Sequence, residues 1–184
     1  FDLQSVGSAS GSILFQPPAL MRLDVRGPLF SRILSAVVDG DLLTAVAGGR
    51  TYYLPATDGL DAFLEIDLAG YDPRLVLLGI VAPPQVGIVD RQFPRADRVR
   101  LELDDGVEGQ SRVLWVDLHL GFVEREVILD ASGQTIWSRR LTDWRRVGDL
   151  YLPERLRIDS GDRRLELTYG KRQLDRGLQR RVFY

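Results

Sequence analysis

Side chains that could do acid–base or nucleophilic chemistry are few in this sequence and lack a catalytic spacing. The single histidine, His119, lies in DLHLGF where a strand should end, so we expect a surface turn position rather than a general base or metal ligand. Cysteine is absent, and the acidic LDDGVEGQ segment lacks the ligand spacing of a calcium loop. GSASGS has Ala9 where a nucleophile elbow needs serine. We therefore expect no catalytic residue, no metal site, no cofactor and no enzymatic activity.

Large apolar side chains are a stronger functional signal than the polar ones. Trp115, Trp137 and Trp144 fall on expected strands or their ends, and Phe63 lies on an expected helix. Aromatic and aliphatic groups gathered on a concave face form a pocket for an apolar ligand. A cavity wall and a core wall share the same alternation, so the sequence allows both interpretations.

The segment RLDVRGPLFSRIL holds apolar residues at a turn. Leu23 and Val25 alternate with charged residues, as on a strand with one buried face, and Gly27 with Pro28 begins a turn. Leu29 and Phe30 follow at or near its tip. Two interpretations remain open: they stay exposed at the loop, or they fold back to cap the end of the sheet.

Short strands separated by turn signals dominate the chain and predict an antiparallel meander. Asp72, Pro73 and Gly79 are typical of a short helix over 73–78, with an N-cap, a first-turn proline and a stop. DGLDAFLEIDL fits helix or strand spacing, and we favour helix. Residues 81–97 contain three prolines and are interpreted as a long surface connection. Strands are expected over 11–15, 20–26, 32–38, 42–46, 50–54, 98–104, 112–118, 122–129, 134–144, 150–159 and 163–172.

Length and charge bound the remaining possibilities. The 184 residues suit one domain spanning 1–184, and no apolar run is long enough to cross a bilayer. The net charge of −2 does not indicate a nucleic-acid partner. Residues 139–184 carry 13 basic and 7 acidic side chains, a net +6 that leaves −8 for residues 1–138. We favour a solvated, ion-paired strand face there over attraction to anionic lipid or an acidic partner.

The order of these segments resembles a known family. PPALMRLDVRGPLFSRILSAVVDGDLLTAV, TYYLPA, a short helix ending in LVLLG, VILDASGQTIWSRRLTDWRRVGDLYLPERLRI and RRLELTYGKRQL follow one another as in the bacterial lipoprotein carrier superfamily typified by LolA and LolB. The resemblance covers nearly the whole chain. It implies a mainly β fold, a half-open antiparallel β-barrel whose concave face is covered by short helices. The family's N-terminal helix and signal or lipid anchor are expected to precede Phe1.

The resemblance also implies a function: non-catalytic binding and transfer of lipoprotein acyl chains or lipid in the periplasm or at the outer membrane of a Gram-negative-type bacterium. RGPLFS occupies the place of a LolB-type membrane-contact loop, which nominates Leu29 and Phe30 for contact with the inner face of the outer membrane. A periplasmic carrier protein is an expected partner. The cavity residues expected from strand phase are Leu23, Val25, Phe63, Leu75, Leu78, Leu103, Trp115 and Trp137.

One family feature is missing, and other functions stay open. The characteristic arginine of the soluble carriers, which locks the helical lid, would fall near Pro17, and the nearby Arg22 should point opposite to Leu23.

The alternative functions are a carrier of a free lipid or apolar metabolite, an envelope sensor or adaptor that binds a protein, and an enzyme using Arg22, Asp24 and Glu65. Bound lipid would separate the carriers from the rest.

Overall fold

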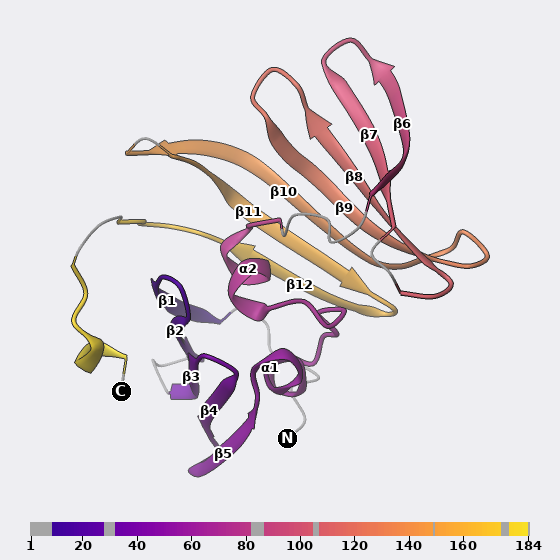
Figure 1. The fold of residues 1–184 in the computed structure, drawn as a ribbon. Helices are drawn as coiled ribbons and strands as arrows, with labels where there is room; N and C mark the ends of the chain where they lie inside the picture. The colour runs from indigo at the N-terminus through magenta and orange to yellow at the C-terminus, as the bar shows by residue number, and fades with distance from the viewer. Residues whose placement is uncertain are drawn as a thin grey trace. The chain divides into compact units, whose positions relative to one another are not determined.

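The computed structural model describes residues 9–27, 32–81, 87–104, 107–148, 150–173 and 177–183. The fold is mainly β, as expected, with two antiparallel sheets and two short helices and no closed barrel (Figure 1). Each sheet is a meander in which neighbouring strands are consecutive in sequence. The chain forms two compact units, Phe1–Arg74 with Asp175–Tyr184, and Leu75–Leu174, called unit 1 and unit 2.

Unit 1 contains the five-stranded sheet and helix α1. The sheet buries one face, on which Leu23, Ala36 and Ala45 lie in register with Tyr52. Its strands are β1 (Ser10–Gln16), β2 (Leu20–Arg26), β3 (Arg32–Asp39), β4 (Leu42–Ala47) and β5 (Arg50–Pro55).

Helix α1 (Ala56–Leu64) packs on β4 and β5 through a glycine. A Cβ atom at Gly59 would lie 2.5 Å from Cδ2 of Leu43 and 2.9 Å from Cβ of Leu54, so the helix approaches the sheet closely. The ring of Phe63 meets that of Tyr52 edge-on, with centroids 5.3 Å apart. The helical interpretation of this segment is confirmed.

The opposite face of the five-stranded sheet carries polar groups and binds the C-terminal segment. Arg22 donates from Nε to Asp24 at 2.8 Å and from Nη1 to the carbonyl of Val182, beside the short 3-10 helix η2 (Arg180–Val182). Burial alone would raise the pKa of Asp24, but the hydrogen bond from Ser35 and the guanidinium of Arg22 outweigh it and hold that pKa below its usual value. Arg22 thus lies opposite Leu23, as the strand phase predicted.

Unit 2 is built on the seven-stranded sheet, whose long strands β10 and β11 are conspicuous in Figure 1. At Asp143, in β10, φ is +56°. The strands are β6 (Ile88–Arg95), β7 (Arg98–Leu103), β8 (Gln110–Asp117), β9 (Phe122–Asp130), β10 (Thr135–Val147), β11 (Leu150–Ser160) and β12 (Arg163–Thr168).

Helix α2 (Pro73–Leu78) forms where the sequence predicted it. Asp72 accepts a hydrogen bond from the backbone N–H of Arg74 at 2.8 Å, which satisfies one of the free donors of the first turn. Gly79 follows with φ of +74°, the left-handed conformation that ends helices.

The interpretation of residues 81–97 as a surface connection is wrong for 88–95, which form β6. Among the strands that the structure describes, this edge strand pairs only with β7, and nearly all its side chains are exposed, so no buried alternation marks it in the sequence. Pro94 is tolerated because an edge strand has backbone groups that need no partner.

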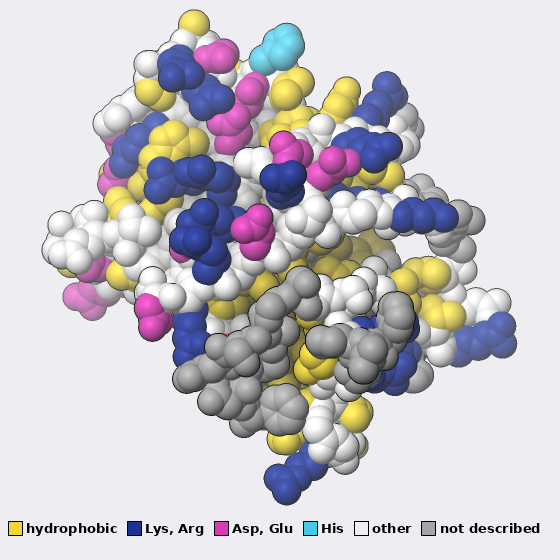
Figure 2. All heavy atoms as spheres, turned by 180° about the vertical axis from the view of Figure 1, so that it is seen from behind, with side chains coloured by type: hydrophobic (Ala, Val, Ile, Leu, Met, Phe, Trp, Pro, Cys, Tyr) yellow, Lys and Arg dark blue, Asp and Glu magenta, His cyan; other side chains and the backbone are white. Residues whose placement is uncertain are grey.

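Charges on the surface are extensively paired. Arg164 lies 2.7 Å from Asp159 and Arg98 lies 3.1 Å from Glu124. Figure 2 shows Arg and Lys side chains next to Asp and Glu side chains around the exposed His119. Among the described residues, no helix is long and apolar enough to span a bilayer, and no group of three or more acidic, His or Cys side chains is placed to hold a metal.

Candidate lipid-binding face of the seven-stranded sheet

One face of the seven-stranded sheet is largely apolar, and we call it the helix side. Directly paired residues of antiparallel strands point to the same face, so the register defines it. One row crosses from β7 to β12 and contains Leu101, Leu114, Glu126, Arg139, Ile158 and Leu165. A second row contains Leu103, Arg112, Ile128 and Trp137, and a third contains Leu141, Leu156 and Leu167.

The end of α2 lies on this face. A Cβ atom at Gly79 would lie 2.7 Å from Cγ of Pro153 and 3.5 Å from Cδ2 of Leu141, so the backbone there touches β10 and β11. The hydroxyl of Tyr169 donates to the carbonyl of Leu77. Burial, partly offset by the charges of Arg172 and Arg139, raises the pKa of Tyr169 to about 12, which keeps this donor protonated. A short helix therefore covers part of the apolar face, within unit 2.

A buried ionic triad interrupts the apolar face. Glu126 accepts from Nε of Arg112 at 2.6 Å and from Nε and Nη2 of Arg139 at 3.0 and 2.5 Å, and all three side chains are at most 2% exposed. Two arginines around one glutamate leave a net positive charge. The remaining donors of Arg139 bind backbone carbonyls in α2 and just after it: Nη1 lies 3.3 Å from the oxygen of Val76 and 3.1 Å from that of Ile80.

Arg139 is the functional candidate that the sequence analysis missed. It was read as one of many arginines on a solvated strand face, yet it ties the carbonyls at the end of α2 to the sheet. The sequence did contain a signal: Arg139 alternates with Trp137 and Leu141, which are both apolar and point to the same face of the strand. A charged residue in phase with a buried face needs a buried partner.

The expected cavity residues fall into three groups. Leu103 and Trp137 are both buried in the second helix-side row, with Arg112 and Ile128 between them, and Leu75 and Leu78 are half-buried on α2. In unit 1, Leu23 is buried and Val25 half-buried on the face that α1 covers, where Phe63 meets Tyr52.

Trp115 is not brought together with Leu103 and Trp137. The register places it on the opposite face of the sheet, between Arg100 and Arg125, whose guanidinium carbons lie 5.9 and 4.8 Å from its ring. Trp115 alternates with Leu114 along β8, so the two side chains lie on opposite faces of the sheet. We leave Trp115 out of the proposed binding face.

Other expected residues are placed as follows. His119 is exposed in the turn after β8, and its backbone N–H donates to Asp117, so the surface-turn prediction is confirmed. Arg22 and Asp24 pair on β2, whereas Glu65 ends α1 with φ of +52°. Leu29 and Phe30 lie outside the described residues, so the membrane-contact loop stays a prediction.

Comparison with known proteins reveals the same architecture in solved structures. A LolA superfamily protein from Nitrosomonas europaea matches with a TM-score of 0.64 at 15% identity, covering 96% of this chain and 81% of that one. A putative outer membrane lipoprotein-sorting protein domain from Vibrio parahaemolyticus matches with a TM-score of 0.63 at 10% identity, covering 95% and 80%.

A third solved structure matches less closely, and comparisons of the sequence found no match. A DUF1329 family protein from Desulfovibrio piger has a TM-score of 0.52 at 10% identity, covering 82% of this chain and 68% of that one. No family model and no curated protein matches the sequence. The order and pairing of strands, with short helices between the sheets in sequence, agree with the resemblance noted in the sequence: the chain has the fold of LolA superfamily proteins.

Proposed function

We propose that residues 1–184 act as one lipid-binding domain of a bacterial cell envelope, which binds and transfers lipoprotein acyl chains or lipids without catalysis. The observation that carries the proposal is the apolar helix side of the seven-stranded sheet in a fold shared with a lipoprotein-sorting domain. Leu101, Leu165 and Leu167 are only half-buried there, which leaves apolar surface for a ligand. Each methylene moved from water to such a surface contributes about 0.8 kcal/mol.

The location and partners belong to the same proposal. A periplasmic or outer-membrane site is supported by the lipoprotein-sorting protein among the structural matches. A periplasmic carrier protein would deliver or receive the cargo. Leu29 and Phe30 would contact the inner face of the outer membrane, where partial insertion of two apolar side chains gives weak and reversible binding.

The first test is native mass spectrometry of protein purified without detergent, followed by lipid analysis of whatever dissociates. We expect a bound acylated peptide or phospholipid. A mass equal to the bare chain after challenge with lipid would contradict the proposal and favour a sensor or adaptor.

A pair of variants tests the proposed face. Leu167 is half-buried on the helix side, while the next residue, Thr168, is exposed and points the other way. Leu167→Glu should weaken binding of a fluorescent fatty acid about tenfold, because a buried Leu contributes roughly 1.5–3 kcal/mol. Thr168→Glu introduces the same charge and should bind as the natural chain does. Equal affinities in the two folded variants would move the ligand away from this face.

A further inference from the structure

A basic hollow lies at one end of the seven-stranded sheet, within unit 2. Its volume is about 380 Å³. It is formed by the last residues of β10, the first part of β11 and the segment after β12. The lining residues are Arg145, Arg146, Val147, Leu152, Glu154, Gly170, Lys171 and Arg172. Four basic side chains and one acidic side chain leave a net charge of +3 around the hollow.

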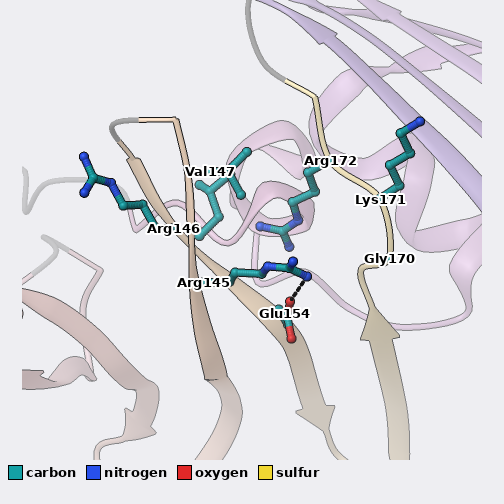
Figure 3. A pocket seen from close by; sticks show the side chains of 8 residues that line it. Arg145, Arg146, Val147, Glu154, Gly170, Lys171 and Arg172 are labelled. Carbon is teal, nitrogen blue, oxygen red and sulfur yellow. Dashed lines mark hydrogen bonds and ion pairs between the residues drawn. The ribbon is translucent and has the colours of Figure 1, made fainter.

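Two guanidinium groups converge there. Figure 3 shows Arg145 and Arg172 pointing toward each other, with Arg146 and Lys171 extending to either side. The side chain of Arg145 is 73% exposed, and Glu154 lies 3.2 Å from it. Two like charges in this arrangement repel each other, so an anion between them would be stabilised by both.

Contacts with Pro153 and Tyr169 hold the side chain of Arg172 in place. It donates from Nη2 to the carbonyl of Pro153, and its guanidinium carbon lies 4.0 Å from the centroid of the Tyr169 ring. Burial lowers the pKa of Arg172, only partly offset by Tyr169 and Glu154, so this cation has lost hydration that an anion would replace. A guanidinium fixed by stacking loses little entropy when it binds a ligand.

We propose that this hollow binds a phosphate group, between the guanidinium groups of Arg145 and Arg172 and with Lys171 at its rim. Arginine forks donate paired hydrogen bonds to phosphate oxygens, and a tetrahedral group can accept from two forks that meet at an angle. Val147 and Leu152 add apolar wall beside the charges, which suits a phosphate carried on an organic group. The inference stands without the acyl-chain proposal, since none of the residues that line the hollow belongs to the three helix-side rows.

Glu154 occupies the position of a competing anion. Its carboxylate pairs with Arg145 and offsets part of the lowering of the Arg172 pKa that burial causes. A phosphate entering the hollow must share these arginines with it. Removing the charge of Glu154 should therefore strengthen phosphate binding, whereas reversing the charge of Arg145 should weaken it.

Inorganic phosphate and amide chemical shifts provide the test on the full chain. We expect phosphate to shift the amide resonances of residues 145–147 and 170–172. Arg145→Glu should weaken binding at least about tenfold, because a hydrogen bond between charged groups is lost and a repulsive charge is added. Glu154→Gln should tighten it. Arg140→Glu is the matched control, an exposed charge reversal on the same strand at a residue that does not line the hollow.

Vesicles separate the two sources of phosphate. Co-sedimentation of the natural chain with vesicles of phosphatidylglycerol and phosphatidylcholine, lost in Arg145→Glu and kept in Arg140→Glu, would identify a lipid headgroup. Binding of inorganic phosphate without vesicle binding would assign the site to a soluble phosphate compound. The site is refuted if phosphate shifts none of these resonances, or if Arg145→Glu and Arg140→Glu bind phosphate equally.

Discussion

At the residue scale, the ion pairs of Arg112, Glu126 and Arg139 are buried, so the stability of the fold depends on all three charges being present. Charges removed from water must recover their lost hydration from partners. Here the carboxylate of Glu126 accepts hydrogen bonds from two guanidinium groups. The remaining donors of Arg139 bind backbone carbonyls at the end of α2. Truncating the shared carboxylate would leave two buried arginines without their anion.

We therefore expect Glu126→Ala to lower the free energy of unfolding by about 3–5 kcal/mol. Urea unfolding followed by far-UV circular dichroism measures this change. Glu124→Ala is the control on the same strand, because Glu124 and Arg98 form a partly exposed pair, 30% and 38% exposed, worth at most about 1 kcal/mol. If both variants lose the same small amount, the helix carbonyls alone compensate Arg139.

At the element scale, the approach of α2 to the sheet depends on the absence of a side chain at Gly79. This residue has φ of +74°, and a Cβ atom would lie 2.7 Å from the ring of Pro153. The positive φ disfavours any L-residue. The close approach to Pro153 leaves no room for a Cβ atom at the present distance between the helix end and β11. The two losses of stability add, because one arises from the backbone conformation of residue 79 and the other from the contact of its Cβ atom with Pro153.

Gly79→Ala should lower the free energy of unfolding by about 2–4 kcal/mol, combining a left-handed backbone with overpacking. Gly161→Ala separates the two effects. It also has positive φ, +56°, but a Cβ atom there meets nothing within 4 Å, so only the backbone cost of about 1–2 kcal/mol is expected. Chemical denaturation of both variants gives the comparison, and equal losses would show that α2 shifts away from Pro153 without cost.

At the scale of the whole molecule, the two compact units are joined in ways that should make them unfold together. The boundary between them falls inside α2, after Arg74, and the chain returns to unit 1 at Asp175–Tyr184 once unit 2 is complete. Arg22 and Asp39 then bind this returning segment. If unit 2 unfolded alone, unit 1 would have to hold together the ends of a long disordered loop.

We expect a single unfolding transition in urea. All three tryptophans, Trp115, Trp137 and Trp144, belong to unit 2, so tryptophan emission reports that unit, while far-UV circular dichroism reports both. Coincident midpoints would support one domain over 1–184. Separated midpoints would mean two independently folding units.

The sequence by itself determined the local features of this protein. Period-2 alternation predicted eleven of the strand regions, and Asp72, Pro73 and Gly79 predicted α2, because these signals act through neighbouring residues. Where exposure removes the alternation, as in β6, the prediction failed. The order of the segments was enough to indicate a LolA-type fold.

Only the tertiary structure decided which residues share a surface. Trp115 and Trp137 look equivalent in the sequence, yet the strand register places them on opposite faces. Arg139 looks like a surface arginine until Glu126 and the carbonyls of α2 surround it. Arg145 and Arg172 meet only because the last residues of β10, the first part of β11 and the segment after β12 line the same hollow. The register depends on turn geometry and on the hydrophobic patterns of both paired strands, so the alternation along one strand does not determine which residues share a surface.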